Sequence, residues 1–551
     1  MNLFSMTTGM RQAERLGEIL RVVARHGWAD WLSRVPSPEL RKLLAGSQAD
    51  AMAGVPAAER FRLMLTELGT TFIKFGQVLS TRSDLLAPAI IEELRKLQAD
   101  TPADPFDVVR ETIREDLGKE PTELFAEFEP EAFSSASIGQ VHRARLPGGQ
   151  EVVVKVQHEG IEAKVRLDLE LLQQLALQIQ THVPDSRPFQ PVVTTREFSR
   201  TLLKELDFRA ERRHMELFAH NFAKDETVHI PAVHAEACGR RVLTMELLSG
   251  ISGARPAELR EAGADLDLFA QRAANVFLNM IFRDGFYHAD PHPGNFLLLD
   301  GEVLGLLDSG MVGRLDDSLR EVCEELLLCM LQNDSEGLAD LLLRVGSAPA
   351  GVDRGAFRSE VGDLLLDHGT RSIAEFDLAV MIDEMTGIVR RHQILMPSSV
   401  SLLLKTLVVL QGTARLLSPT FALGELLEPF KQQLIRQRLD PRRWLRKLQH
   451  SLRDVDRLVT HAPGNLADIL DRMRTGTLRM RHEHANLEAV ANRLVEGVLI
   501  ASLFLGSSLL LGGAFPPQWF GVSVVGGLGF LVAALLGGRL LRTIARERRG
   551  V

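Results

Sequence analysis

Cysteine is scarce in this sequence, and neither sign of charge dominates it. Three cysteines in 551 residues cannot form a disulfide framework, so we expect a reducing compartment for the soluble part. A net charge of −8, from 64 Lys+Arg against 72 Asp+Glu, argues against a nucleic-acid-binding protein. The ordinary shares of apolar (45%) and charged (25%) residues exclude a fibrous or low-complexity chain.

A targeting signal is also missing from the start of the sequence. Residues 1–7 lack the basic stretch and long apolar run of a secretory signal. They contain no arginine, which argues against a transit peptide. We therefore expect no cleaved leader.

Two long apolar runs lie near the C-terminus. Residues 497–515 and 519–537 are uncharged and are separated by a Pro-Pro-Gln tripeptide. Each run is about 28 Å long as a helix, close to the ~30 Å of a hydrocarbon core. Three small residues recur at four-residue spacing in the second run, a pattern of close helix packing: Gly529, Ala533 and Gly537. We expect a transmembrane helical hairpin over residues 493–540, with a buried hairpin of a soluble core as the alternative.

Basic residues gather on both sides of this hairpin. Residues 434–482 hold twelve Lys+Arg against five Asp+Glu, and residues 539–551 hold five Arg and one Glu. The positive-inside rule then places both ends, and the soluble part, on the cytoplasmic side. We expect residues 431–492 to form a basic amphipathic linker on anionic headgroups, with a solvated helical linker as the alternative.

The rest of the chain has the pattern of an α+β protein in three parts. Residues 1–104 show the apolar spacing of helices. Residues 105–250 mix helices with strands, including a hairpin that turns at Pro147-Gly148-Gly149. Residues 251–430 are mostly helical with one short hairpin.

That short hairpin follows the most informative segment, residues 288–295, which read His-Ala-Asp-Pro-His-Pro-Gly-Asn. A strand, a turn at Asp300-Gly301 and a second strand then lead to an Asp-Ser-Gly tripeptide that begins at Asp308. A two-residue turn folds the strands back on each other, so Asn295 and Asp308 should emerge at the same end of the hairpin.

These residues carry the chemistry of a phosphotransferase. An amide oxygen from Asn295 and a carboxylate from Asp308, with Asp290 nearby, suit Mg²⁺. The order and spacing match protein-kinase-like enzymes, in which Asp290 would be the catalytic aspartate and the other two would hold metal. The alternative, a metal bound by His288 and His292 with Asp290, leaves Asp308 unexplained.

Kinase chemistry further needs a strand lysine that pairs with the nucleotide phosphates. Lys155 is the only lysine on its apolar strand and fits this role. Residues 133–140 stand where a loop over the phosphates is expected, but they contain one glycine rather than a Gly-x-Gly-x-x-Gly pattern. Glu246 and Leu247 follow another apolar strand, where a kinase hinge reads adenine.

Two polar clusters remain. Lys74 and Gln77 share a face of an expected helix over residues 66–79, and Ser80, Arg82 and Asp84 follow it. A second group of acidic residues lies on a later helical stretch, where carboxylates are ordinarily solvated: Glu205, Asp207 and Glu211.

Four segments together resemble the UbiB family of atypical kinase-like proteins. They are Lys74-Phe75-Gly76-Gln77 with Ser80, Arg82 and Asp84; Ala136-Ser137-Ile138-Gly139-Gln140; Glu205-x-Asp207; and residues 288–295. The resemblance covers most of the chain, including the C-terminal spans. The last segment alone is shared with small-molecule phosphotransferases, whereas the lysine helix and the alanine loop are not.

The resemblance implies a two-lobed protein-kinase-like fold with an N-terminal helical extension over the active site. The extension would be residues 1–104, the N-lobe 105–250 and the C-lobe 251–430. Lys74 would reach Glu205 and Asp207, and with Gln77 these residues would be regulatory. The residues expected at ATP are Ala136, Ser137, Ile138, Gly139, Lys155, Glu211, Glu246 and Leu247, with Lys155 paired to Glu211.

The resemblance also implies ATP and Mg²⁺ as cofactors and an ATPase that supports ubiquinone biosynthesis. The expected location is the bacterial inner membrane, with two spans. The expected partners are membrane lipids, isoprenoid quinone precursors and a quinone-biosynthesis enzyme complex, and a homodimer is allowed. A pseudokinase scaffold and a small-molecule phosphotransferase are the alternatives.

The sequence departs from the family at two places. Ser134 and Ser135 stand where alanines are typical, and Ser309 replaces the aromatic residue of Asp-Phe-Gly. Neither change removes an expected metal ligand.

Overall fold

The computed structural model describes residues 3–28, 54–97, 101–183, 186, 189–349, 351–369, 377–424, 426, 487–513, 516–519 and 522–547. The chain divides into two compact units, Met1–Asp440 and Pro441–Val551. The basic segment expected over residues 434–482 lies outside the described residues.

The larger unit begins with helices that share a core with later parts of the chain. These are α1 (Leu3–Val23) with its π-turn η1 (Ala24–Trp28), α4 (Ala57–Leu68), α5 (Thr70–Leu79) and α6 (Pro88–Arg95). The helix expected over residues 66–79 is interrupted at Gly69, whose φ of 92° lies in the region that favours glycine. Phe75 of α5 packs against Phe198 with ring centroids 5.0 Å apart.

A five-stranded sheet forms the N-lobe, in the order β1-β3-β4-β6 with β2 beside β3. The strands are β1 (Glu127–Phe128), β2 (Ser134–Ser135), β3 (Gly139–Arg145), β4 (Glu151–Gln157) and β6 (Val242–Glu246). The expected hairpin is confirmed, because Arg145 of β3 pairs with Glu151 of β4. Helices α7 (Phe106–Leu117) and α8 (Pro121–Leu124) precede the sheet. Val109 and Ile113 of α7 share a small core with Val152, Val154 and Val156 of β4.

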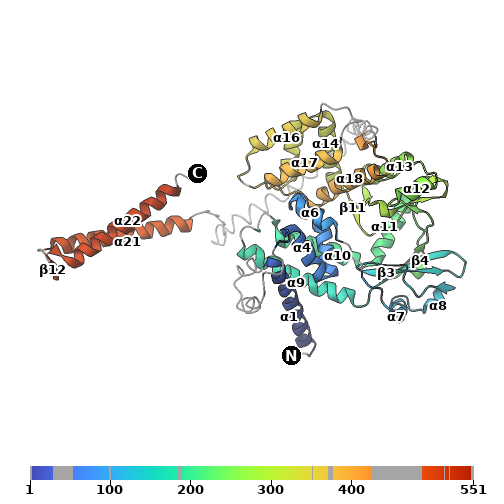
Figure 1. Cartoon of the computed structure of the whole chain (residues 1–551), viewed down its shortest axis with the longest axis horizontal. Helices are drawn as coiled ribbons and strands as arrows, with labels where there is room; N and C mark the ends of the chain where they lie inside the picture. Colours follow the sequence, from blue (N-terminus) through green and yellow to red (C-terminus); the bar gives the residue numbers. More distant parts are fainter. Residues whose placement is uncertain are drawn as a thin grey trace, which may run out of the picture. The chain divides into compact units, whose positions relative to one another are not determined.

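Among the described residues, three α-helices lie between β4 and β6. They are α9 (Ile161–His182), α10 (Pro191–Glu205) and α11 (Phe208–Asn221). Helix α9 lies beside α10 and contacts α1, and both α9 and α10 contact α5 (Figure 1). The chain returns through β5 (Val228–His229) and η4 (Ala235–Ala237).

The C-lobe holds the hairpin expected after residue 295. The strands are β7 (Ile251–Ser252), β8 (Phe286–His288), β9 (Phe296–Leu299), β10 (Val303–Leu306) and β11 (Val312–Arg314), with η6 (Pro293–Asn295) before β9 and η7 (Asp300–Glu302) after it. The hairpin loop has three residues rather than two, because Leu299 pairs with Val303. Both Gly301 and Glu302 have positive φ, 72° and 61°. The two ends still meet, since Leu307 N–H donates to Asn295 O at 2.9 Å.

A group of helices completes the C-lobe. They are α12 (Pro256–Glu261), α13 (Leu266–Leu278) with η5 (Asn279–Asp284), α14 (Asp317–Gln332), α15 (Ser335–Val345), α16 (Arg354–Gly369), α17 (Leu378–Arg391) and α18 (Ser398–Leu417). Helix α18 is long and apolar enough to cross a membrane, but 56% of its apolar stretch is buried inside the unit. It therefore packs as a core helix.

The smaller unit is a helical hairpin of α21 (Leu487–Gly512) and α22 (Val524–Glu547), joined by β12 (Gln518–Trp519) and β13 (Val522–Ser523). The second helix begins at Val524, not near residue 519, because the short ladder occupies that backbone and Val524 N–H donates to Pro517 O. A Cβ on Gly529 would collide with the Ser507 hydroxyl, and Ala533 is buried, so the expected small-residue face is confirmed as a packing face.

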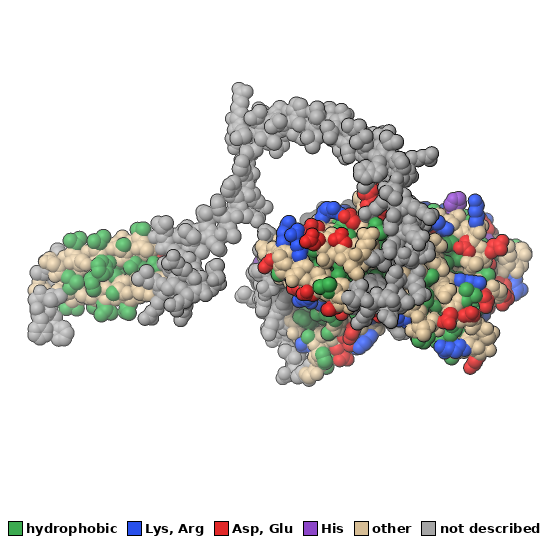
Figure 2. Space-filling view, turned by 90° about the horizontal axis from the view of Figure 1, so that it is seen from above, with side chains coloured by type: hydrophobic (Ala, Val, Ile, Leu, Met, Phe, Trp, Pro, Cys, Tyr) green, Lys and Arg blue, Asp and Glu red, His purple; other side chains and the backbone are tan. Residues whose placement is uncertain are grey.

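The outer surface of this hairpin is apolar. Figure 2 shows hydrophobic side chains along it, whereas the visible face of the larger unit carries charges of both signs. Leu505 and Leu509 of α21 are 65% and 75% exposed, and Leu535 of α22 is 68% exposed. Residues 495–512 are long and apolar enough to span a membrane and are scarcely buried, whereas the apolar part of α22, residues 524–540, is shorter.

Candidate nucleotide and metal site

Lys155 projects from the middle of β4 toward helix α11. Its Nζ lies 3.0 and 2.9 Å from the two carboxylate oxygens of Glu211. Strand β4 is central in the sheet and α11 contacts the neighbouring strand β6, so rigid elements hold both partners. Burial alone would lower the pKa of Lys155, but Glu211 and Asp308 outweigh burial and raise it above the ordinary lysine value. The structure thus brings Lys155 and Glu211 together as a charged pair.

Asp308 lies within the field of this lysine. Desolvation opposes its ionisation, but the charge of Lys155 and the hydrogen bond from the Gly310 N–H help to lower its pKa to about 2. Its backbone φ of 44° lies in the left-handed region. The Gly310 N–H donates to its Oδ1 at 2.9 Å. Asp308 is therefore a carboxylate that stays ionised at neutral pH.

Asn295 is oriented so that its oxygen can act as a ligand. Its Nδ2 donates to the Asp290 carbonyl at 3.0 Å and lies 3.3 Å from Asp290 Oδ2. With the amide nitrogen directed to Asp290, the amide oxygen is left for a cation. A carboxylate from Asp308 and an amide from Asn295 form an all-oxygen donor set, which suits Mg²⁺ completed by water and phosphate oxygens.

His288 links the catalytic loop to the metal loop. Its Nδ1 accepts from Asp290 N–H at 3.1 Å, and its Nε2 donates to the carbonyl of Asp308. His292 Nδ1 accepts from Gly294 N–H at 3.2 Å. Both nitrogens of His288 are therefore used within the protein. The described residues contain no cluster of three His, Cys, Asp or Glu suited to a metal. The alternative metal site at His288 and His292 is not supported.

The expected phosphate loop is a tight turn between β2 and β3. Ala136 N–H donates to Gly139 O at 2.9 Å, and Ser137 and Ile138 are buried. A Cβ on Gly139 would lie 2.5 Å from the carbonyl of Val156, so only glycine fits there.

His158 braces this turn, a contact that the sequence did not predict. Its Nε2 lies 2.9 Å from the Ala136 carbonyl, and its Nδ1 lies 3.0 Å from Asp104 Oδ2. The main-chain N–H of Asp104 donates to the Gln140 side chain at 2.5 Å. The end of the N-terminal extension therefore holds the loop in place.

Lys74 of α5 reaches toward the same site. Its Nζ lies 2.9 Å from Glu205 Oε2. Burial would lower the pKa of Lys74, but Glu205 and, more weakly, Asp308 raise it. The expected contact with Asp207 is wrong: Asp207 pairs with Arg209 at 2.9 Å and caps α11. The reason is local, since an aspartate at this position satisfies the free N–H groups of the helix start.

Gln77 and the hinge residues have structural contacts. Gln77 Nε2 donates to Leu97 O at 3.0 Å and so fastens α5 to the end of α6. Glu246 is held through its carboxylate, which contacts His229 Nε2 at 2.9 Å. The Leu247 N–H donates to Glu151 O at 3.2 Å, so this N–H is used within the sheet, and the role of Glu246 and Leu247 at adenine stays a prediction.

Helix α18 contacts the backbone of the catalytic loop through its side chains. Thr413 Oγ1 donates to Pro291 O at 2.7 Å, and Thr406 Oγ1 contacts Ala289 O at 3.3 Å. Lys405, beside Thr406, is half-buried. Burial lowers its pKa, and the charge of Asp290 opposes this effect. The contacts of Thr413, Thr406 and Lys405 were not predicted from the sequence, because more than 100 residues separate these side chains from the loop.

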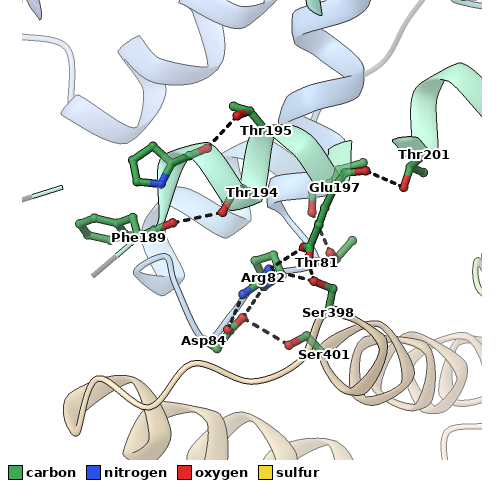
Figure 3. A network of polar contacts seen from close by, with 12 residues as sticks. Thr81, Arg82, Asp84, Phe189, Thr194, Thr195, Glu197, Thr201, Ser398 and Ser401 are labelled. Atoms are coloured by element: carbon green, nitrogen blue, oxygen red, sulfur yellow. Dashed lines mark hydrogen bonds and ion pairs between the residues drawn. The ribbon is translucent and has the colours of Figure 1, made fainter. Parts of the chain in front are cut away.

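Figure 3 shows a polar network at the start of α18 that joins the N-terminal extension to both lobes. Arg82, which follows α5, forms two 2.9 Å contacts with Asp84, one to each oxygen. Its Nη1 lies 3.3 Å from Ser398 of α18 and 3.7 Å from Glu197 of α10. Ser401 contacts Asp84 at 3.4 Å. The Arg82 and Asp84 side chains are almost fully buried, so this network fixes the extension across the two lobes.

Comparison with known proteins finds family models that match three parts of the chain. A family model described as the ABC1 atypical kinase-like domain matches residues 96–342. A UbiB helical domain matches residues 363–422, and an ABC1/UbiB kinase-like C-terminal domain matches residues 479–546.

Curated relatives extend over most of the chain. A probable protein kinase UbiB from Marinobacter nauticus is 32% identical over 451 residues, 80% of this chain and 82% of the relative. One from Azotobacter vinelandii is 32% identical over 455 residues, 81% of this chain and 84% of the relative. A solved structure titled as the complex of Rv3197 with erythromycin from Mycobacterium tuberculosis covers 64% of this chain and 90% of its own, at 23% identity and a TM-score of 0.46.

Proposed function

Since the chain belongs to the UbiB family of atypical kinase-like proteins, we propose that it is a membrane-anchored, Mg-ATP-dependent ATPase or atypical kinase that supports ubiquinone biosynthesis. The observation that carries the proposal is the convergence of the Lys155–Glu211 pair, ionised Asp308 and the Asn295 amide beside Asp290. These groups come from both lobes and match the parts of a phosphoryl-transfer site.

Each residue has a role that follows from its contacts. Lys155, held by Glu211, would neutralise phosphate charge, and Asp308 and Asn295 would hold Mg²⁺. The bound ion would supply further charge stabilisation to the phosphates. Asp290, fixed by Asn295 and by His288, would orient the attacking group, either water or an acceptor hydroxyl.

The position of the extension favours a small or water acceptor over a protein. Lys74 is bound to Glu205, and its charge helps to lower the pKa of Asp308. Both observations support an extension that covers the site. The buried contacts of Arg82 to α10 and α18 support the same view. A closed cover disfavours a protein chain at Asp290, so turnover would be ATP hydrolysis or transfer to a small molecule.

The hairpin supports attachment to a membrane. The apolar outer surfaces of α21 and α22 would lie in lipid, and the basic residues beyond them favour a cytoplasmic location for the larger unit, at a bacterial inner membrane. We assign the 431–492 segment to the anionic headgroups. Isoprenoid quinone precursors would be presented from that membrane, with other quinone-biosynthesis enzymes as partners.

The test is ATP binding and hydrolysis by the purified full-length protein in anionic liposomes. Wild type should hydrolyse ATP only with Mg²⁺, and the Asp308→Asn variant should lose hydrolysis because it loses the charged ligand. Wild type that binds Mg-ATP but hydrolyses none would favour the scaffold alternative. Wild type that binds no nucleotide would contradict the proposal.

A further inference from the structure

The metal loop of this chain lacks the side chain that ordinarily anchors it. In Asp-Phe-Gly loops the aromatic residue packs and sets the loop conformation. Here the position is Ser309, which is buried at 2% exposure but too small to pack in that way. Asp308 before it has a φ of 44°, an unfavourable backbone for a non-glycine residue. Other contacts must therefore hold the loop.

Three main-chain carbonyls of this loop are held. The Asp308 carbonyl accepts from His288, and the Met311 carbonyl accepts from Ala289 N–H at 3.0 Å, so both are held by the catalytic segment of the C-lobe. The Ser309 carbonyl lies 3.1 Å from His214 Nδ1. Of the three contacts, this one alone comes from helix α11 of the N-lobe.

The His214 ring is placed to donate to this carbonyl. Its centroid lies 5.6 Å from that of Phe286 on β8, which limits its rotation. Burial lowers the pKa of His214, so the ring is neutral at pH 7. A carbonyl oxygen can only accept, so the proton of the neutral ring resides on Nδ1.

His214 and Glu211 stand three residues apart and share one face of α11. Glu211 sets the position of Lys155, whose charge acts on Asp308. One helix face thus contacts both the phosphate-binding lysine and the metal loop. A displacement of α11 would disturb both at once.

We propose that His214 is a positioning residue that holds the metal loop in register with α11 through its hydrogen bond to the Ser309 carbonyl. It takes the place of the missing aromatic anchor and keeps Asp308 directed at the cation. The inference rests on the proposed function, because it assumes that Asp308 holds Mg²⁺.

The test separates the hydrogen bond from the ring with matched variants of the full-length protein. His214→Asn keeps a donor at the position of Nδ1, whereas His214→Phe keeps the ring packing on Phe286 but has no donor. His220→Phe, on the exposed face of the same helix, is the control. Binding of a fluorescent ATP analogue is titrated with Mg²⁺, and again in EDTA.

We expect His214→Phe to raise the Mg²⁺ concentration for half-maximal binding at least tenfold, as for other residues that orient a metal ligand. Affinity in EDTA should change less than twofold. His214→Asn and His220→Phe should stay within threefold of wild type. A His214→Phe titration that matches wild type overturns the inference, and so does a His214→Asn variant as impaired as His214→Phe.

Hydrogen exchange of residues 308–314 without nucleotide gives an independent readout. His214→Phe should exchange faster there than wild type, and His214→Asn should not. If wild type itself binds no nucleotide with Mg²⁺, the proposed function fails, and this exchange alone decides whether His214 anchors the loop. Equal exchange in His214→Phe and wild type would then overturn the anchor as well.

Discussion

Replacing Arg82 with methionine should destabilise the larger unit strongly, although Arg82 lies outside the nucleotide site. The variant leaves the Asp84 carboxylate buried with Ser401, 3.4 Å away, as its remaining described side-chain contact. Removing one partner of a buried ion pair costs about 3–5 kcal/mol. Asp84→Asn should cost less, because Arg82 would retain Glu197 at 3.7 Å and Ser398 at 3.3 Å.

The expected change in melting temperature follows from the size of the unit. An unfolding entropy of roughly 2.1 cal/mol/K per residue gives about 0.9 kcal/mol/K for the larger unit, which spans Met1–Asp440. Arg82→Met should therefore lower the apparent melting temperature by about 3–5 °C. Differential scanning calorimetry of the full chain in detergent measures this change.

The matched control is Arg255→Met, which removes an exposed pair of 3.1 Å with Glu258. Exposed pairs contribute about 0–1 kcal/mol, so this variant should shift the melting temperature by less than about 1 °C. Hydrogen exchange over residues 81–97 should also increase in Arg82→Met, because the extension loses its contacts to α10 and α18. The reasoning is refuted if Arg82→Met and Arg255→Met melt alike.

Three further predictions concern the site and the hairpin. Lys155→Met should weaken Mg-ATP binding at least tenfold by calorimetric titration, because it removes the charge held by Glu211; unchanged affinity would exclude Lys155 from phosphate binding. The double substitution Leu505→Asp with Leu509→Asp should release the protein from liposomes in flotation, since each buried charge costs about 2.5–3.5 kcal/mol in a membrane. Leu366→Asp, at a residue of the larger unit that is also exposed at 70%, should still float, and equal flotation of both variants would argue against the anchor. Because the folded pKa of Asp308 is lowered to about 2 from an ordinary 3.8, its ionisation contributes stability above about pH 4 that is lost as pH falls toward 2. Asp308→Asn should therefore show a shallower loss of unfolding free energy between pH 5 and 3, and parallel curves would contradict the lowered pKa.

Features fixed by local chemistry were predictable from the sequence. The Pro-Gly-Gly turn places β3 beside β4, and the hairpin after Asn295 brings Asp308 back to it. The hairpin loop was predicted to have two residues but has three. The sequence pattern does not indicate that Glu302 takes a positive φ. The error left the site intact, since the strand register still aligns its two ends.

Contacts between distant segments were not predictable without the fold. Thr413 reaches Pro291 across 122 residues, and His214 reaches Ser309 across 95. A single histidine or threonine on a helix belongs to no sequence pattern that predicts its hydrogen-bond partner. The partner of Asp207 was predicted wrongly because of a local contact. Asp207 caps the start of α11 and pairs with Arg209 instead of contacting Lys74.

The proposed function requires a charged metal ligand at Asp308, and hence ATP use, for ubiquinone synthesis. The most direct measurement is the quinone content of a strain that lacks this protein, complemented with wild type or with Asp308→Asn at equal membrane abundance. The account predicts that wild type restores ubiquinone and that Asp308→Asn does not. Full restoration by Asp308→Asn would contradict it and would indicate a protein that acts as a scaffold without ATP turnover.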